Sequence, residues 1–297
     1  MNKKIIIGLL GILVVFGVIF LIQKENSGNK KIPASNKLVS VNSITHGHGL
    51  AVDVGDSNRL YIATHHGLLV LVNDKDLYAV GSSKDDYMGF SPNPRDAKVI
   101  FSSGHPESGG NIGFQKSEDG GFTWEKISDG VNGPVDFHAM TVSSVNPDLI
   151  FGWYQGAIQR SSDSGKNWEI VSKTNAPIVS LVADPKDENI IYAASPRGLM
   201  VSKNKGEDWS VLFDGFVSTI AVNPGDSQKL ISFSEKHKLA RSNDGGTNWE
   251  PVNENFTGET PLHISFDKHK SEIIYTLTEK NSLYKSVDSG NTWNKIR

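Results

Sequence analysis

Six of the nine histidines in this chain lie between residues 46 and 138, and several carboxylates are interspersed with them. Imidazole nitrogens bind Zn²⁺, Cu²⁺ and Ni²⁺, and a carboxylate oxygen can complete the coordination of such an ion. The run THGHG places His46 and His48 two residues apart, so both rings point the same way if the segment is an extended strand. The chain contains no cysteine, so histidine and carboxylate are the remaining side-chain ligands for a transition metal.

These residues predict a metal or ligand site whose only indicated cofactor is a transition metal ion. In the run THHG, His65 and His66 point to opposite faces of an extended strand, and we favour His66 because it matches His105 in the repeat described below. The alternative is that each ring is an ordinary polar group or a hydrogen-bonded strand cap. Three later histidines lie among lysines and polar residues and are interpreted as surface residues: His237, His263 and His269. The predicted metal ligands are His46, His48, His66, His105 and His138.

Three carboxylates near these histidines are candidates for the acid and base of a glycoside hydrolase, namely Asp86, Asp136 and Glu107. The sequence contains no P-loop, dinucleotide-binding, nucleophile-elbow or HExxH motif that would indicate another catalytic chemistry. The residues therefore leave open whether the protein is an enzyme.

A short motif recurs five times and defines the elements that must position these residues. Five of the six tryptophans close a copy, and they lie 44, 41, 40 and 44 residues apart. In such a motif Ser and Asp can bind backbone amides of a tight turn, Gly can take positive φ, and Trp can pack between sheets. The recurring aspartates are therefore interpreted as structural. The copies are SEDGGFTW at 117–124, SSDSGKNW at 161–168, SKNKGEDW at 202–209, SNDGGTNW at 242–249 and SVDSGNTW at 286–293.

Each copy lies in a frame of four short β-rich runs separated by turn residues. About 40 to 45 residues with four strands is the size of one propeller blade. The segment at 49–80 follows the same frame although its motif is reduced to VNDKDLY, so six blades fill residues 37–297. The sequence thus predicts an all-β fold, a six-bladed β-propeller of four-stranded antiparallel blades. We expect residues 37–41 (KLVSV) to pair with the last blade and close the ring.

The frame also predicts which rim of the propeller carries the candidate site. Strands of a blade alternate in direction, so the loop entering the first strand and the turn between strands two and three lie at one rim. The five motifs lie between strands three and four, at the opposite rim. His48 and His138 begin first strands, whereas His66 and His105 end second strands. The predicted site residues therefore gather at the rim opposite the motifs.

The five motifs resemble the Asp-box, or bacterial neuraminidase repeat, S-x-D-x-G-x-T-W, and the resemblance covers essentially all of residues 37–297. Asp-box propellers include sialidases, xyloglucanases, sortilins and photosystem II assembly factors, and this chain resembles small bacterial sortilin-like or "glycosyl hydrolase"-labelled propeller proteins. The resemblance implies a glycan hydrolase or a protein-interaction scaffold. A sialidase is disfavoured, because it needs an arginine cluster and this chain has six arginines and no F/Y-R-I-P motif.

The N-terminal segment predicts a location at the membrane. Residues 5–22 form an uncharged apolar run after Lys3 and Lys4, long enough to cross a hydrocarbon core as one transmembrane helix. We expect a membrane anchor or signal segment at 1–22 and a flexible polar tether at 23–36, followed by the propeller outside the cytoplasm. An anchor is favoured because signal peptides usually have shorter apolar cores and a small-residue cleavage site, and cleavage would make the protein secreted.

The composition narrows the classes of partner. The formal net charge of −3 provides no basic excess for a phosphate backbone, so nucleic acid is excluded as a main partner. The sequence predicts a single-pass, membrane-anchored binding protein with a His/carboxylate metal or ligand site and a protein or glycan ligand. The alternatives are a glycoside hydrolase-like enzyme and a protein-interaction or assembly scaffold.

Overall fold

The computed structural model describes residues 37–253 and 255–297. The predicted anchor at 1–22 and tether at 23–36 lie outside these residues. In the part of the chain that is described, no helix is long and apolar enough to cross a membrane.

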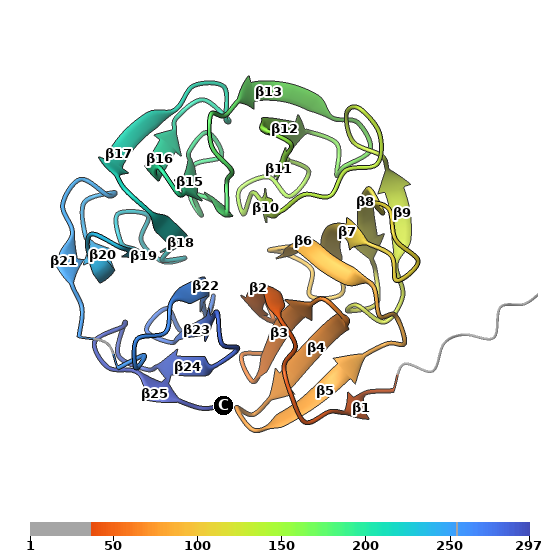
Figure 1. Ribbon diagram of the computed structural model, residues 1–297, viewed down its shortest axis with the longest axis horizontal. Coiled ribbons are helices and arrows are strands. Elements are labelled where there is room, and N and C mark those ends of the chain that lie inside the picture. The colour runs from red at the N-terminus through yellow and green to blue at the C-terminus, as the bar shows by residue number, and fades with distance from the viewer. Residues whose placement is uncertain (1–36, 254) are drawn as a thin grey trace, which may run out of the picture. The chain divides into compact units, whose positions relative to one another are not determined.

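The described residues form six antiparallel sheets arranged as a ring, which confirms the predicted six-bladed propeller (Figure 1). Each sheet is built from strands that are consecutive in the sequence. Blade one comprises β2 (Gly47–Val52), β3 (Arg59–Thr64), β4 (Gly67–Val72) and β5 (Asp76–Val80), with β1 (Val39–Ser40) added at its edge. Blade two comprises β6 (Asp86–Pro92), β7 (Ile100–His105), β8 (Phe114–Ser117) and β9 (Glu125–Ser128). Blade three comprises β10 (Ala139–Val142), β11 (Ile150–Tyr154), β12 (Ala157–Ser161) and β13 (Glu169–Lys173).

The other three blades repeat this order. Blade four comprises β14 (Ser180–Ala183), β15 (Ile191–Ser195), β16 (Gly198–Ser202) and β17 (Ser210–Asp214). Blade five comprises β18 (Val217–Val222), β19 (Leu230–Ser234), β20 (Lys238–Ser242) and β21 (Glu250–Pro251). Blade six comprises β22 (Pro261–Phe266), β23 (Ile274–Thr278), β24 (Leu283–Ser286) and β25 (Asn294–Lys295). The first strands lie nearest the axis, where each contacts the first strand of the next blade, and the fourth strands lie at the perimeter (Figure 1).

Apolar packing between neighbouring blades holds the ring together. The second and third strands are buried on both faces and read as apolar runs, such as RLYIAT in β3, because a blade lies against each of their faces. The described residues form six apolar clusters, one in each gap between adjacent blades. This packing between sheets replaces the single central core of an ordinary domain.

The Asp-box residues hold the turn between strands three and four, as the sequence predicts. In blade three the Ser161 hydroxyl accepts a hydrogen bond from the Gly165 amide at 2.8 Å and donates one to Asp163 at 2.9 Å. The Asp163 carboxylate accepts from the backbone and side chain of Asn167, and these bonds lower the pKa of Asp163 to about 2. The Trp168 indole donates to the Gly165 carbonyl. The serine–glycine bond recurs in the other four boxes. Asp119, Asp244 and Asp288 likewise accept from backbone amides of their turns, and Asn204 does so in blade four, so the box carboxylates are structural.

The segment at 37–41 does not pair with the last blade, and that prediction is wrong. Val39 pairs with Ala79 and Ser40 with Tyr78, which places β1 on the outer edge of blade one. Blade six completes its sheet with its own fourth strand, β25. No strand is therefore shared between the first and last blades in the described part of the chain.

Side chains close the ring between blades one and six. The residues of the apolar cluster between blades one and six are Leu60, Ile62, Leu71, Leu277 and Leu283.

A polar contact links the same two blades. Asp74 of blade one forms an ion pair with Lys285 at 2.6 Å and accepts a hydrogen bond from the Tyr275 hydroxyl at 2.8 Å. Asp74 lies in the degenerate motif VNDKDLY, so blade one has lost its box but keeps a carboxylate that links it to blade six.

Candidate functional site

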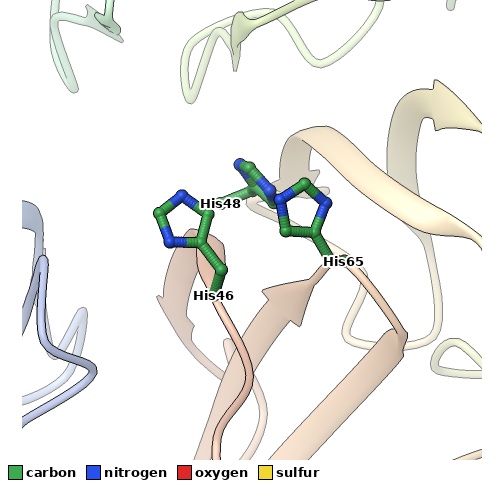
Figure 2. Close-up of side chains that lie close together, drawn as sticks. All are labelled: His46, His48 and His65. Carbon is green, nitrogen blue, oxygen red and sulfur yellow. The ribbon is translucent and has the colours of Figure 1, made fainter.

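Three histidines of blade one gather at the rim opposite the Asp-boxes (Figure 2). His46 precedes β2, His48 lies within β2, and His65 directly follows β3. The ring centroids are 4.9 Å apart for His46 and His48, 5.2 Å for His46 and His65, and 4.2 Å for His48 and His65. Each ring offers one nitrogen, and the three nitrogens lie within 4.8 Å of one another. Ligands of one tetrahedral ion with bonds of about 2.1 Å lie about 3.4 Å apart, so these rings would have to move closer together to share an ion.

The backbone around His48 is shaped for close packing at the ring axis. The pairing of β2 with β3 shifts register between Gly47 and Gly49, so His48 is the extra residue of a β-bulge. A Cβ atom on Gly47 would lie 2.3 Å from Leu277 of blade six, and one on Gly49 would lie 2.8 Å from the Cβ atom of Phe90 in blade two. The two glycines therefore let the neighbouring blades approach while the bulge directs the imidazole into the mouth of the ring.

Asp86, the first residue of β6, brings a carboxylate to the three histidines. One of its oxygens is 2.5 Å from His65 Nδ1, and Oδ1 is 3.5 Å from His48 Nε2. His48 Nε2 and Asp86 Oδ1 are both buried without a hydrogen-bond partner. Burial, followed by the charges of His65 and His46, lowers the pKa of His48 to about 3, so this ring is neutral at physiological pH. Neutral imidazole is the form that binds a metal ion.

A second group joins blades two and three at the same rim. His105 Nε2 and His138 Nε2 are each 2.9 Å from the same oxygen, Oδ2 of Asp136. The Asp136 side chain is only 3% exposed, whereas the two rings are 42% and 50% exposed. The hydrogen bond to Asp136 raises the pKa of His138. His138 and His48 line one cavity of about 170 Å³, so the two groups face a common mouth.

The structure divides the predicted ligands between these two groups. His46 and His48 lie together, and His105 and His138 meet at Asp136. His66 does not join either group, because the exposed turn carries His65, rather than His66, toward His46 and His48. Among the candidate acid and base residues, Asp86 and Asp136 are each placed beside two histidines. Glu107 is exposed, and its backbone amide donates to Asp85.

Sequence reasoning missed two residues of this rim. The choice of His66 applied strand alternation to THHG, but β3 ends at Thr64, and alternation does not hold in the turn that follows. His263 was interpreted as a surface residue, and that is wrong: it is partly buried in β22, where its ring nitrogen is 3.2 Å from the Gly47 carbonyl. The repeat frame places His263 in the first strand of blade six, next to blade one, so its position near the run THGHG could have been predicted from the sequence.

The neutral buried histidines should make stability depend on pH. Burial lowers the pKa of His263 to about 4, and that of His48 to about 3, whereas both rings titrate near 6.5 when unfolded. Between pH 6.5 and pH 4 these rings therefore bind protons in the unfolded chain but not in the folded chain. The free energy of unfolding is highest above pH 6.5 and decreases as the pH falls toward 4. At pH 5 the expected loss is at most about 2 kcal/mol for each ring. Urea unfolding at pH 7 and pH 5 in a chelator measures it.

The variant His263→Gln should lose less stability than the wild type between pH 7 and pH 5. His269→Gln is the matched control, because His269 is exposed. Equal pH dependence of His263→Gln and the wild type would contradict this interpretation.

The fold and the five motifs define the chain as a six-bladed Asp-box β-propeller. A family model described as "Sortilin, neurotensin receptor 3" (Sortilin-Vps10) matches residues 237–297. A xyloglucanase of Paenibacillus sp is 29% identical over 188 residues, which covers 53% of this chain and 16% of that enzyme. A xyloglucanase of Hypocrea jecorina (strain QM6a) is 25% identical over 146 residues, which covers 40% of this chain and 17% of that enzyme. The chain thus spans about a sixth of the length of the curated relatives it matches.

Solved structures share the fold at low sequence identity. The GH74 enzyme of Niastella koreensis superposes with a TM-score of 0.58 at 15% identity, covering 84% of this chain and 46% of that one. YCF48 from Cyanidioschyzon merolae superposes with a TM-score of 0.59 at 16% identity, covering 87% of both chains. The comparisons thus show similarity to a sortilin model at residues 237–297 and to xyloglucanases over part of the chain, and the solved structures show a shared propeller fold.

Proposed function

We propose that this protein is a membrane-anchored, extracytoplasmic binding propeller that holds a transition metal ion at the mouth opposite the Asp-boxes. The anchor is the apolar run at residues 5–22, and the ligands are His46, His48, His65 and Asp86. The ion, or a ligand coordinated through it, is what the protein binds.

The observation that carries the proposal is the pair of buried ligand atoms without partners, His48 Nε2 and Asp86 Oδ1. A buried acceptor with no donor is costly, and a cation between the two atoms would satisfy both. Two ligands bound to one tetrahedral ion at about 2.1 Å are about 3.4 Å apart. The observed separation of 3.5 Å agrees with that geometry. Three imidazoles and one carboxylate favour Zn²⁺, Cu²⁺ or Ni²⁺ over Mg²⁺ or Ca²⁺.

The proposal is tested by metal binding to the purified full-length protein. After chelator treatment, the wild type should take up Zn²⁺ with submicromolar affinity in isothermal titration calorimetry, and His48→Ala should lose this binding. His66→Ala is the matched control, because His66 is a neighbouring exposed ring outside the group. A wild type that binds none of Zn²⁺, Cu²⁺ and Ni²⁺, or a His48→Ala variant of unchanged affinity, would contradict the proposal.

A glycan-directed activity is the second candidate, favoured by the similarity to two xyloglucanases. Asp86 and Asp136 would then supply the acid and base at the mouth. Reducing-sugar release from xyloglucan and related polysaccharides, compared between the wild type, Asp86→Asn and Asp136→Asn, tests it. Absence of turnover in the wild type counts against this candidate, as does turnover that both variants retain.

A protein-interaction scaffold is the third candidate, supported by the shared fold of YCF48, one structure of which has a D1 peptide bound. Crosslinking of the protein in its native membrane, followed by mass spectrometry, tests it. Recovery of only the protein itself would count against a scaffold.

A further inference from the structure

A pocket lies between blades three and four, beside their outer strands β13 and β17 (Figure 1), and we propose that it binds a small aromatic carboxylate. Its volume of about 360 Å³ is typical of a ligand site. Met200, Trp209 and Val211 give the pocket an apolar wall, and Arg197 and Lys173 give it positive charge. It shares no residue with the proposed metal site, so this inference does not depend on the proposed function.

The first argument is a comparison with the gap between blades four and five, where a phenylalanine ring fills the corresponding space. Phe213 is the fourth residue after the box tryptophan of blade four, and its ring packs against Trp249 at 5.6 Å and His237 at 4.9 Å between ring centroids. In blade three the fourth residue after the box tryptophan is Ser172. Its hydroxyl accepts a hydrogen bond from the Trp209 indole at 3.1 Å.

The residues that correspond to the two partners of this phenylalanine both line the pocket. The repeat matches Trp209 to Trp249, and it matches Arg197, in the turn between β15 and β16, to His237 in the turn between β19 and β20. Serine is much smaller than phenylalanine, so space that an aromatic ring occupies in the next gap is open here. A ligand ring can occupy this space and pack against the Trp209 indole.

The second argument is the charge of the lining. Arg197 and Lys173 are exposed, and within the part of the chain that the structure describes neither side chain has a hydrogen-bond or ion-pair partner. Asp214 is the one acidic residue of the lining, which therefore carries two formal positive charges and one negative charge. A guanidinium group binds a carboxylate through two parallel hydrogen bonds. The excess of positive charge therefore favours an aromatic acid over a neutral aromatic ligand.

The test is the binding of cinnamate to the purified full-length protein, measured by ligand-observed NMR titration. A chelator is present, so that the carboxylate cannot bind through a metal ion at the mouth. The wild type should bind one equivalent with a Kd of about 1 mM or tighter, as expected for a ligand of this size. The neutral analogue cinnamamide should bind at least about 10-fold more weakly, because it cannot form a charge-assisted pair with Arg197.

Two variants locate the binding. Ser172→Phe should abolish it, because the new ring fills the space as Phe213 does in the next gap. Arg197→Gln should weaken it by about 10-fold through loss of the guanidinium group. Lys236→Gln is the matched control, since Lys236 is an exposed cation in the corresponding turn of blade five and lies outside the pocket. Thermal melts followed by circular dichroism show whether each variant folds.

The outcomes separate the ways in which the proposal can fail. A wild type that does not bind cinnamate overturns it, as does an affinity that Arg197→Gln leaves unchanged. Equal affinities for cinnamate and cinnamamide indicate a purely apolar groove and overturn the assignment to an anion. A folded Ser172→Phe variant that still binds cinnamate places the ligand elsewhere and also overturns the proposal. If Ser172→Phe does not fold, the exposed position of Arg197 and the cinnamamide comparison decide.

Discussion

Asparagine at Asp86 is expected to weaken Zn²⁺ binding at the mouth by about 10- to 100-fold while leaving the ring folded. The replacement keeps the size of the side chain and an oxygen that can accept from His65, but removes the negative charge beside His48. That charge is what offsets the charge of a bound cation in a group whose other ligands are neutral imidazoles. Competition with a chromophoric zinc chelator measures the change in affinity.

The chain offers a control one residue away. Asp85→Asn removes the same charge from the adjacent position, and asparagine can still accept the hydrogen bond that Asp85 receives from the Glu107 amide. Its affinity for Zn²⁺ should stay within about threefold of the wild type, because Asp85 is partly exposed and lies outside the proposed ligand set, so solvent weakens its effect on the ion. Equal losses in Asp85→Asn and Asp86→Asn would show a general field effect and contradict direct coordination by Asp86.

Alanine at Gly165 is expected to reduce the free energy of unfolding by about 3 kcal/mol or more. Gly165 lies in the Asp-box of blade three with φ of +84°, and an added Cβ atom would lie 1.9 Å from the ring of Phe114 in blade two. Phe114 is fully buried and packs edge-on against Trp168 at 5.1 Å between ring centroids, so it cannot move aside. The variant therefore combines backbone strain with a clash between blades. Urea denaturation midpoints measure the loss.

Gly156→Ala isolates the backbone contribution to that loss. Gly156 has almost the same φ, +82°, but the nearest atom to an added Cβ is the Thr174 carbonyl oxygen at 3.8 Å. Its expected loss is about 1 kcal/mol, since only the left-handed conformation is penalised. Similar losses at the two positions would contradict the packing argument for Gly165.

The fold was predictable because the box tryptophans set a period that is also the length of a blade. What the sequence could not show was the partner of residues 37–41. The strand β5 pairs with β4 over five residues without a register shift, whereas bulges interrupt the outer strands of blades two, three and four. Loss of the box in blade one leaves a straight outer edge that β1 can extend. The position of β1 therefore depends on the turn between β4 and β5, and the composition of KLVSV does not reveal it.

The candidate site was only partly predictable, for a similar reason. The frame correctly assigned residues to a rim, because the positions of strand ends follow from the repeat. It could not assign ring directions in the turn after Thr64, so His65 was passed over for His66. It also could not show that one carboxylate, Asp136, lies between two histidines from different blades, because this contact depends on how adjacent blades pack.

Because each blade is made of strands that are consecutive in the sequence, the ring can be assembled in the order of synthesis. The strands within each of blades one to five can pair as that blade emerges from the ribosome, since these contacts are local, and its apolar faces are covered as the next blade follows. The gap between blades one and six is different, as His263 meets the Gly47 carbonyl across 216 residues. The backbone between His46 and His48 thus gains its last support only when blade six is translated. A metal ion bound at the mouth would therefore be held by a fully supported backbone only after blade six has packed against blade one.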